Sequence, residues 1–497
     1  MSLSIIYTRA RYGIDAPLIT VEVHLSNGLP SLSIVGMPET VVKESKDRVR
    51  SALINSQFEF PARRITINLA PADLPKEGSR FDLPIAIGIL AASNQIPSES
   101  LAHFEFIGEL ALSGELRDVN AILPAAIACH DSQRRLLTSC NNAYEAARYE
   151  GSSNYGAKSL LNICEHLHGV NLLAKAQPHP VTEKVNSLDF ADVKGQPFAK
   201  RALEITAAGG HNLLMYGSPG TGKTMLASRL PSIMPPLTSQ QSIEVASIHS
   251  LCGHAYTTWS TPPFRHPHHS ASAVALVGGG SQPKPGEISL AHHGVLFLDE
   301  CPEFQRQVLE VLREPMESGE INISRANAQV RFPAAFTLVA ALNPCPCGYF
   351  GSCSEKHHCR CSPDNIRRYR QKISGPLLDR IDLHVPVAHT RMTELQQLPQ
   401  GERSADIRQR VETARKKQLQ RQHKPNARLN KQEINRICCL DHSNRIFLEK
   451  AVDTLGLSAR AYDRILKTAR TIADLKKNEN IEKEELSEAI SFRNFDH

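Results

Sequence analysis

One eight-residue run constrains this chain more than any other feature of its sequence. It reads Gly217, Ser218, Pro219, Gly220, Thr221, Gly222, Lys223 and Thr224. This glycine loop follows a short apolar segment, 212–216, and precedes 225–230, where apolar residues have helical spacing. In the order strand, glycine loop, helix, backbone N–H groups turn inward around phosphates, Lys223 supplies a cation, and Thr224 offers a hydroxyl to Mg²⁺. The run therefore predicts an α/β domain with a parallel sheet that binds a nucleoside triphosphate.

Two further apolar runs end in polar residues suited to the same chemistry. The run 294–298 ends in Asp299 and Glu300, and the run 337–342 ends in Asn343. Asp299 is predicted to hold Mg²⁺, and Glu300 to polarise the water that attacks the γ-phosphate. The Asn343 amide can hydrogen-bond that phosphate or the water from an adjacent strand end. Together with the glycine loop, these residues predict hydrolysis of ATP rather than nucleotide binding alone.

The order of these elements resembles an AAA+ ATPase. Downstream of Asn343, the segment 376–382 contains Arg380, and Arg460 opens a helical run nearer the C-terminus. The resemblance implies that Asn343 is sensor 1, Arg380 the arginine finger and Arg460 sensor 2. It also implies a ring, because such a finger reaches the nucleotide of a neighbouring subunit. For an isolated arginine, an ordinary surface ion pair is the alternative.

Four further segments narrow the resemblance to one family. They are Phe264–Ser272, Leu276–Gly280, Pro285–Gly294 and Gly375–Asp382. In these segments the chain resembles the magnesium-chelatase-like bacterial proteins of the ComM/YifB family. The resemblance implies a hexameric DNA motor that is driven by ATP with Mg²⁺. Such a motor binds single-stranded and branched DNA and moves the branch point along the duplex. In this way it promotes strand integration in natural transformation and homologous recombination. Recombinase proteins are its candidate partners.

The resemblance also implies a division into domains. Residues 1–170 are expected to form a Lon-protease-like α/β domain and 171–190 a linker rich in Pro and polar residues. Residues 191–388 are expected to form the AAA+ ATPase core, and 389–497 a C-terminal helical lid. The expected fold class is therefore α/β, with a helical region at the C-terminus.

The first of these domains is not expected to be a peptidase. Arg80 stands where Lon proteases have their nucleophilic serine, and Leu123 stands where they have a lysine. Ser79 is adjacent to Arg80, but a serine without a positioned base is a weak nucleophile. Similar inactive domains occur in a recombination protein, where they support ring assembly and DNA engagement.

Cysteines crowd into one short segment, 345–361, within the expected ATPase core. Two Cys-x-Cys pairs, separated by a loop, can supply four thiolates in the tetrahedral geometry that zinc prefers. We predict structural zinc on Cys345, Cys347, Cys359 and Cys361. Cys353 with His357 or His358 can exchange into the ligand set, and reduced or redox-sensitive thiols are the alternative. The resemblance implies that some family members keep these pairs and others lack them, so catalysis is not expected to depend on the metal.

Two groups of histidines also invite a metal assignment, and we decline it. His266, His268 and His269 lie in one group, and His292 and His293 in the other. No spacing pattern defines a coordination geometry for either group, so a polar role in pore or subunit contacts is the stronger interpretation.

Basic residues in three places are candidates for DNA contact. The segment 320–332 has the pattern of a hairpin with Arg325 near its tip, and a solvated turn charge is the alternative. The segment 403–430, which includes Lys416 and Lys417, has nine Lys and Arg against two acidic residues, so its net charge of +7 exceeds the +6 of the whole chain. A solvated basic helix between subdomains is the alternative there. A third cluster lies at 367–372.

Composition limits the remaining possibilities. The chain has 12 cysteines, no evident signal peptide and no apolar run of 18 residues, so we expect a cytoplasmic protein that does not engage the membrane. Two other functions stay open. One is a protein- or cofactor-remodelling ATPase of the magnesium-chelatase type, and the other is a regulatory module that binds nucleotide without turnover.

Overall fold

The structure is a computed structural model that describes most of the chain. The described residues are 3–178, 188–253, 256, 258–280, 283–325, 328–351, 358–390 and 396–493. They form two compact units. The first unit comprises 1–183, 242–259 and 324–332, and the second comprises 184–241, 260–323 and 333–497. Two stretches from the middle of the chain therefore fold with the N-terminal residues.

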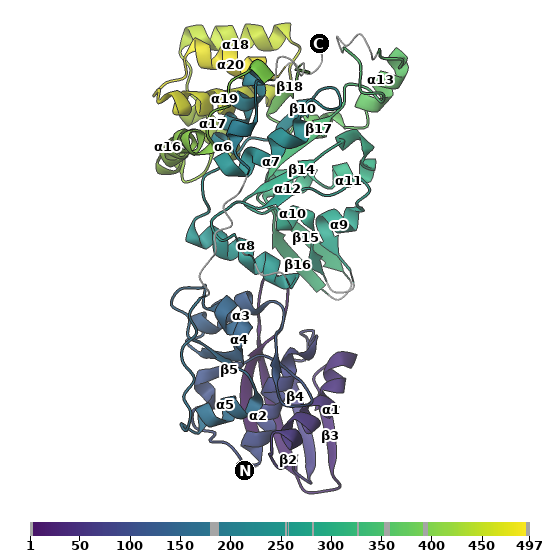
Figure 1. Ribbon diagram of the computed structural model, residues 1–497, viewed down its shortest axis with the longest axis vertical. Helices are drawn as coiled ribbons and strands as arrows, with labels where there is room; N and C mark the ends of the chain where they lie inside the picture. The colour runs from purple at the N-terminus through teal and green to yellow at the C-terminus, as the bar shows by residue number, and fades with distance from the viewer. Residues whose placement is uncertain are drawn as a thin grey trace. The chain divides into compact units, whose positions relative to one another are not determined.

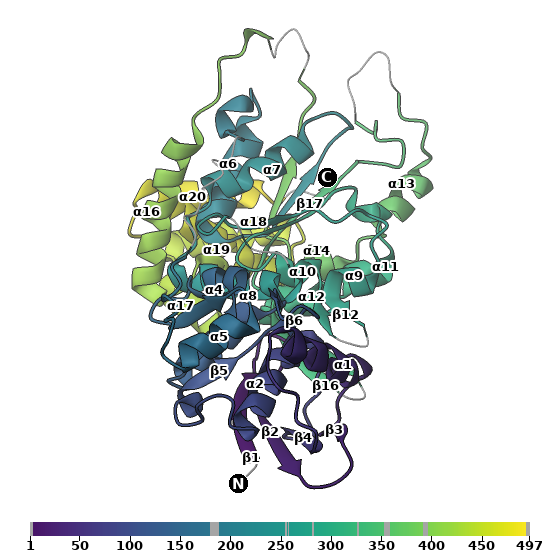
Figure 2. The ribbon, with the colours of Figure 1, turned by 60° about the horizontal axis from the view of Figure 1, so that its bottom comes forward.

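The first unit is built on a seven-stranded mixed sheet. Its strands, in spatial order, are β3 (Ser31–Val35), β4 (Arg64–Ala70), β2 (Leu18–Ser26), β1 (Leu3–Arg9), β5 (Phe104–Phe106), β8 (Arg135–Ser139) and β9 (Asn154–Ala157). β2 pairs antiparallel with β1 and β4, and the other neighbours are parallel. Figure 2 shows β1 to β4 side by side. Alternate residues of β2 are buried because one face of the strand packs on the core.

Helices cover this sheet. They are α1 (Thr40–Asn55), α2 (Asp82–Ala92), α3 (Ile122–Asp131), α4 (Cys140–Ala146) and α5 (Leu160–Leu167). Most of α8 (Ser239–Leu251) also belongs to this unit. Every residue of α2 is buried, as expected for a helix that is apolar on all sides. Its first residue, Asp82, is a buried carboxylate that accepts hydrogen bonds from Ser45 and Arg48, which compensate its burial. The hairpin of β15 (Glu320–Arg325) and β16 (Ala328–Pro333) has its distal part in this unit.

The second unit is built on a five-stranded parallel sheet. In spatial order its strands are β11 (Phe264–Arg265), β14 (Val295–Leu298), β17 (Thr337–Leu342), β10 (Leu213–Tyr216) and β18 (Leu383–Pro386). All residues of β14 and β17 are buried, because helices cover both faces of a parallel sheet and leave no solvated side. The carboxyl ends of β10, β14 and β17 lie at one edge, which positions the residues that follow each strand.

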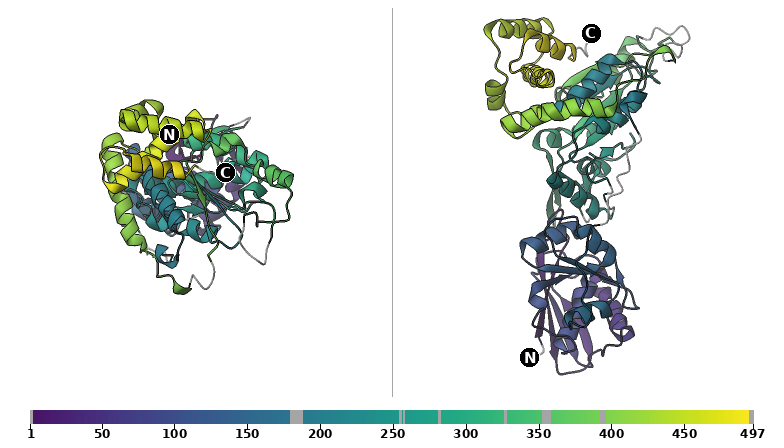
Figure 3. Two further views of the ribbon diagram at one scale, coloured as in Figure 1. Left: turned by 90° about the horizontal axis from the view of Figure 1, so that it is seen from above. Right: turned by 60° about the vertical axis from the view of Figure 1, so that its left-hand side comes forward.

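Helices flank this sheet, and further helices follow it along the chain. The flanking helices are α6 (Pro197–Gly209), α7 (Lys223–Ile233), α9 (Ala273–Val277), α10 (Glu287–Leu290), α11 (Arg306–Glu310), α12 (Arg313–Ser318), α13 (Pro363–Arg370) and α14 (Gly375–Leu378). The C-terminal helices are α16 (Ser404–Gln422), α17 (Lys431–Ile437), α18 (His442–Thr454), α19 (Ala459–Lys476) and α20 (Lys483–Ser491). α16 contacts α6, α7 and α19, and Figures 1 and 3 show the C-terminal helices gathered together.

The expected architecture is confirmed at the level of fold class. An N-terminal sheet, a parallel five-stranded sheet and a helical C-terminal region follow one another along the chain. Among the described residues, no helix has both the length and the apolar character that crossing a bilayer requires.

Candidate functional site

The glycine loop 217–224 joins β10 to α7, as its sequence predicts. Gly220 and Gly222 have φ values of +78° and +89°, in the left-handed region that favours glycine. α7 begins at Lys223, so the N–H groups of its first turn lie at the loop. The Lys223 ammonium donates to the carbonyls of Gly217 at 2.7 Å and Ser218 at 3.0 Å, and burial lowers its pKa. The loop thus holds a buried cation at the place where phosphates are expected.

The predicted Mg²⁺ ligands come together although they lie far apart in the sequence. Asp299 follows β14, and the Thr224 hydroxyl donates to its carboxylate at 2.6 Å. A hydroxyl and a carboxylate are the hard oxygen ligands that Mg²⁺ takes, with substrate phosphates and water completing its shell. This pair therefore fits the cofactor that its sequence positions predict.

Asn343, at the end of β17, also reaches the glycine loop. Its side-chain oxygen accepts a hydrogen bond from the Lys223 ammonium at 3.2 Å. β17 lies between β10 and β14 in the sheet, so its carboxyl end is next to both the glycine loop and Asp299. The structure therefore brings the proposed sensor 1 asparagine to the expected phosphate position.

Glu300 has a partner that the sequence did not indicate. Its carboxylate lies 3.5 Å from Nδ1 of His269. Glu300 also has a φ of +50°, a left-handed conformation that is strained for a residue with a side chain. This proximity follows from the strand order, because β11 pairs with β14 and the residues after β11 therefore lie next to those after β14. His269 is thus a neighbour of the proposed catalytic base.

A cavity of about 370 Å³ adjoins the glycine loop. Its lining includes Val193, Gln196 and Leu226 together with the loop residues 220–222. Apolar walls with a few polar groups suit a nucleotide base and its sugar. Sequence reasoning missed this cavity, because its lining comes from the residues before α6, from α7 and from the segment after β18.

The two predicted arginines differ in their surroundings. Arg380 is buried and pairs with the carboxylate of Glu317, at the end of α12, at 2.7 Å. It also donates to the carbonyl of Pro376 at 2.7 Å. Arg460 is exposed in the first turn of α19. The proposed finger is therefore held within its own chain, by a glutamate that the sequence did not single out.

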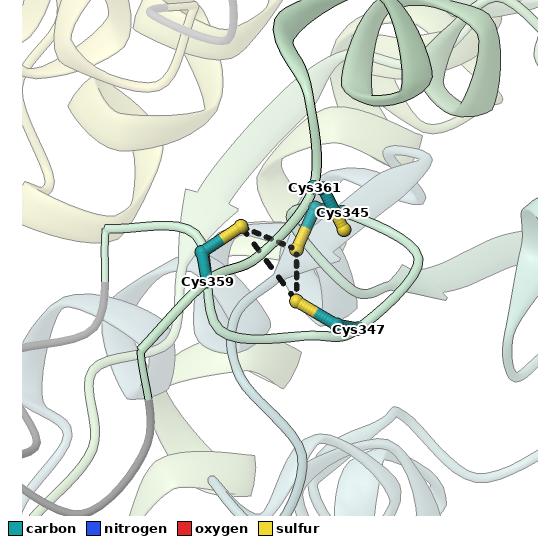
Figure 4. A group of neighbouring side chains, drawn as sticks. All are labelled: Cys345, Cys347, Cys359 and Cys361. Atoms are coloured by element: carbon teal, nitrogen blue, oxygen red, sulfur yellow. Dashed lines mark hydrogen bonds between the residues drawn. The ribbon is translucent and has the colours of Figure 1, made fainter.

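The four predicted zinc ligands converge (Figure 4). They are Cys345, Cys347, Cys359 and Cys361, and their Sγ atoms all lie within 4.8 Å of one another. The Cys345 Sγ atom is 3.2 Å from that of Cys347 and 3.6 Å from that of Cys359. Zn–S bonds of about 2.3 Å in a tetrahedron separate sulfurs by about 3.8 Å, so the group fits zinc. Cys353 and His357 lie outside the described residues.

Hydrogen bonds to sulfur support the same interpretation. Burial and the neighbouring thiols raise the pKa of Cys359 and Cys361. At Cys347 the Tyr349 N–H is the largest of several contacts that lower the pKa, to about 6, and the Phe350 N–H donates to the Cys345 thiol at 3.3 Å. Such outer contacts orient thiolates and favour the deprotonated form that binds metal. The segment 345–361 therefore has the donor set, the spacing and the supporting N–H groups of a closed structural site.

The basic segment 403–430 is mostly engaged inside the second unit. Arg410 pairs with Glu204 at 2.8 Å, and Arg421 pairs with Asp474 at 2.9 Å. Further contacts join Arg408 to the Ser232 carbonyl, Arg415 to the Ala207 carbonyl, Lys424 to Glu433, and Lys417 to the Lys477 carbonyl. Lys416 is exposed. Much of this charge therefore holds α16 and its neighbours in place.

The predicted hairpin is present, and Arg325 is the last residue of β15. On the returning strand, Gln329 exchanges hydrogen bonds with Tyr12: the Tyr12 hydroxyl donates to the Gln329 carbonyl at 3.1 Å, and the Gln329 N–H donates to that hydroxyl at 3.3 Å.

The residues at the expected Lon-type catalytic positions lie in the same unit. Arg80 and Leu123 are both buried, and the Ser79 hydroxyl donates to Glu109. That serine therefore lies beside the Glu109 carboxylate, which accepts a hydrogen bond from its hydroxyl.

A parallel sheet, a glycine loop, a strand-end carboxylate pair and a polar residue on the strand between them define a P-loop nucleotide hydrolase of the AAA+ type. Family comparison agrees. Residues 189–395 match the family described as magnesium chelatase, subunit ChlI, residues 21–142 match subunit ChlI of Mg-chelatase, and residues 401–493 match the subunit ChlI C-terminal family.

Individual relatives narrow this assignment. The chain is 53% identical to competence protein ComM of Haemophilus influenzae, over 99% of this chain and 98% of that protein. It is 50% identical to protein YifB of Escherichia coli, over 100% of this chain and 98% of that protein. The magnesium-chelatase 38 kDa subunit of Rhodobacter capsulatus is 28% identical over 35% of this chain and 55% of that protein. The chain belongs to the ComM/YifB family of magnesium-chelatase-like AAA+ ATPases.

Proposed function

We propose that this chain is an ATP-driven DNA motor that acts as a hexameric ring and migrates DNA branches. The observation that carries the proposal is the convergence of Lys223, Thr224, Asp299 and Asn343 at one edge of a parallel sheet. The name of the Haemophilus relative supports a role in competence, and hence in integrating incoming single strands by homologous recombination. Recombinase proteins are the partners that such a role requires.

The chain's own residues divide the hydrolytic work among them. Lys223 exchanges its two carbonyl partners for phosphate oxygens when ATP binds, and Thr224 with Asp299 holds Mg²⁺. Mg²⁺ neutralises phosphate charge when it is bound. Glu300 orients the attacking water, and its contact with His269 holds the carboxylate at the mouth of the site.

The remaining roles require a second subunit. Arg380 must leave Glu317 to reach a neighbouring nucleotide, so the finger engages only when subunits close on one another. Arg460, exposed at the start of α19, is the proposed sensor 2. Opening and closing of these interfaces then moves the DNA-contacting residues.

The proposed DNA contacts are basic residues of the hairpin and of α16. Arg325 ends the first strand of the hairpin, and Lys416 and Lys417 lie on α16. Cations at such positions attract phosphates without reading sequence. The N-terminal unit, as a Lon-like but non-proteolytic domain, and the C-terminal helices, as a lid, would support the ring, and zinc would stabilise the segment 345–361.

A chelatase-type remodelling ATPase is the second candidate. It is supported by the match to the magnesium-chelatase 38 kDa subunit of Rhodobacter capsulatus and by the pairing of the α16 cations. Because several cations of the segment 403–430 are paired within the protein, this segment supports DNA binding less than its composition suggests. Only an assay with DNA separates the two functions.

The deciding experiment is ATP-dependent branch migration of a synthetic four-way junction. Wild type should migrate the branch, Lys223→Ala should lose nucleotide binding, and Glu300→Gln should bind ATP without turnover. ATP turnover without any effect on DNA would favour the remodelling function. A protein that stays monomeric with ATP, Mg²⁺ and DNA, yet hydrolyses ATP at full rate, would refute the shared site.

A further inference from the structure

The loop that carries Cys345 and Cys347 is attached to the ATP site at two points. It begins two residues after Asn343, whose side chain accepts a hydrogen bond from Lys223 at 3.2 Å. Its other attachment is at Gly348, which has a φ of +83°. A Cβ atom at that position would lie 2.6 Å from the Cγ and Cδ atoms of Pro219, inside the glycine loop. The cysteine loop therefore lies directly against the loop that is proposed to hold phosphates.

The same turn is fastened to the cysteine cluster. The Gly348 N–H donates to the Cys345 carbonyl at 2.9 Å, and the Phe350 N–H donates to the Cys345 thiol at 3.3 Å. Cys345 is fully buried, so this end of the turn has little freedom. Cys359 and Cys361 come from the far side of the segment, and the Cys359 sulfur lies 3.6 Å from those of Cys345 and Cys347. A metal at the cluster would thus close the turn that supports Pro219.

We propose that metal binding by the four cysteines sets the affinity of the glycine loop for ATP, through the contact between Gly348 and Pro219. The proposal rests on the ATP-binding function proposed above. When the metal closes the turn at 345–348, Pro219 is held in one position. Without the metal, the glycine loop becomes ordered only when the nucleotide binds, and the free-energy cost of this ordering weakens nucleotide binding. The metal is therefore a positioning element for the phosphate-binding loop and not a catalytic one.

This coupling has a distinct kinetic signature. Asp299 and Glu300 follow β14 and do not belong to the cysteine loop, so the chemical step is expected to keep its rate once ATP is bound. Loss of metal should therefore raise KM for ATP and leave kcat nearly unchanged. Typical coupling between two sites changes affinity by about 5- to 150-fold, and one supporting contact points to the lower end, about tenfold.

Linkage requires the reverse effect as well. If metal binding raises ATP affinity by some factor, ATP must raise metal affinity by the same factor. In the full-length protein, zinc release to a chromophoric chelator should therefore slow when ATP is present. This readout does not depend on turnover, and it can be followed in Glu300→Gln, which is expected to hold ATP without hydrolysing it.

The first test compares zinc-loaded and chelator-stripped full-length protein by titration with a fluorescent ATP analogue. We expect the dissociation constant to rise about tenfold on stripping and to recover when Zn²⁺ is added back. Unchanged nucleotide affinity in stripped protein would overturn the proposal, and so would purified protein that binds nucleotide tightly but holds no zinc. Zinc-loaded protein that binds no nucleotide would instead overturn the proposed ATP-binding function.

The second test keeps the metal and alters the contact. Gly348→Ala places a methyl group against Pro219, whereas Gly351→Ala, at a φ of +74°, has no described residue within 4 Å of its added Cβ. Both variants carry the strain of a left-handed alanine, so their difference isolates the contact. We expect Gly348→Ala to weaken nucleotide binding severalfold at full zinc content and Gly351→Ala to match wild type. Equal nucleotide affinity in the two variants would overturn the proposal.

Discussion

The segment 376–382, which contains the proposed arginine finger Arg380, is anchored to the C-terminal helices by a buried ion pair. Arg464 of α19 donates to the Asp382 carboxylate at 2.6 Å and to the Arg380 carbonyl at 3.1 Å. The Asp382 side chain is only 3% exposed. Burial by itself would raise the pKa of Asp382, but the charge of Arg464, the nearby His211 ring and a hydrogen bond from the Asn212 N–H hold it well below its usual range. The pair therefore stays ionised at neutral pH.

Arg464→Met removes this cation and keeps most of the side-chain volume. Breaking a buried pair from one side costs about 3–5 kcal/mol, because the carboxylate remains buried without its partner. At about 1.4 kcal/mol per tenfold, the opening equilibrium of the surrounding elements should rise about 100-fold to a few thousand-fold. Arg464→Met combined with Asp382→Asn should cost less, since no uncompensated charge remains.

Hydrogen exchange read by mass spectrometry measures this effect within the full chain. Amides of β18 and α19 should lose protection in Arg464→Met, while peptides from β2 in the first unit report any general loss of structure. Lys431→Met is the matched control, because it breaks a pair with Asp463 in which the lysine is 64% exposed, and such pairs contribute about 0.2–1 kcal/mol. Exchange of α19 in Arg464→Met within about fivefold of wild type, or a double variant as unprotected as the single one, would refute the reasoning.

Three further predictions test other parts of the second unit. Glu317→Gln removes the carboxylate that holds Arg380. Because Glu317 is 60% exposed, the ion pair contributes at most about 1 kcal/mol, so ATP turnover should rise up to about fivefold. A fall in turnover would contradict release of the proposed finger. Burial lowers the pKa of His384 to about 3, against about 6.5 in an unfolded chain, so its stabilising effect is complete above pH 6.5 and declines as the pH falls toward 3. The free energy of unfolding of His384→Leu should therefore depend less on pH between 6.5 and 4, and parallel curves would count against this. Lys416→Ala with Lys417→Ala should weaken binding of single-stranded DNA and reduce the slope of log Kd against log salt by about 1.4, at about 0.7 per phosphate contact; an unaltered slope would remove these lysines from the DNA contacts.

The ATP site could be anticipated because its parts are short-range patterns. A glycine loop must connect a strand to a helix to present its N–H groups, so the order of residues around 217–224 already contains the local geometry. Asp299 and Asn343 could be placed because the carboxyl ends of parallel strands meet at one edge of a sheet. The cysteine cluster could be anticipated for a similar reason, since paired cysteines a few residues apart can close on one metal.

The partners of charged side chains could not be anticipated in this way. From composition, the segment 403–430 looks like a free basic surface, yet Arg410 and Arg421 are paired with Glu204 and Asp474, which lie on other helices. Charge attracts over several ångströms and without a fixed spacing in the sequence, so the choice of partner depends on which helices pack together. The same holds for the pairing of Arg380 with Glu317 and for the position of His269 beside Glu300.

Short local runs of residues thus determine the glycine loop and the paired cysteines of this chain. Backbone geometry over a few residues suffices to build a phosphate-binding loop or a pair of metal ligands. Which cations of 403–430 are paired, what holds Arg380, and why the cysteine loop lies against Pro219 depend instead on segments brought together from distant parts of the chain. Those contacts arise from packing of whole elements, which no short stretch of sequence specifies by itself.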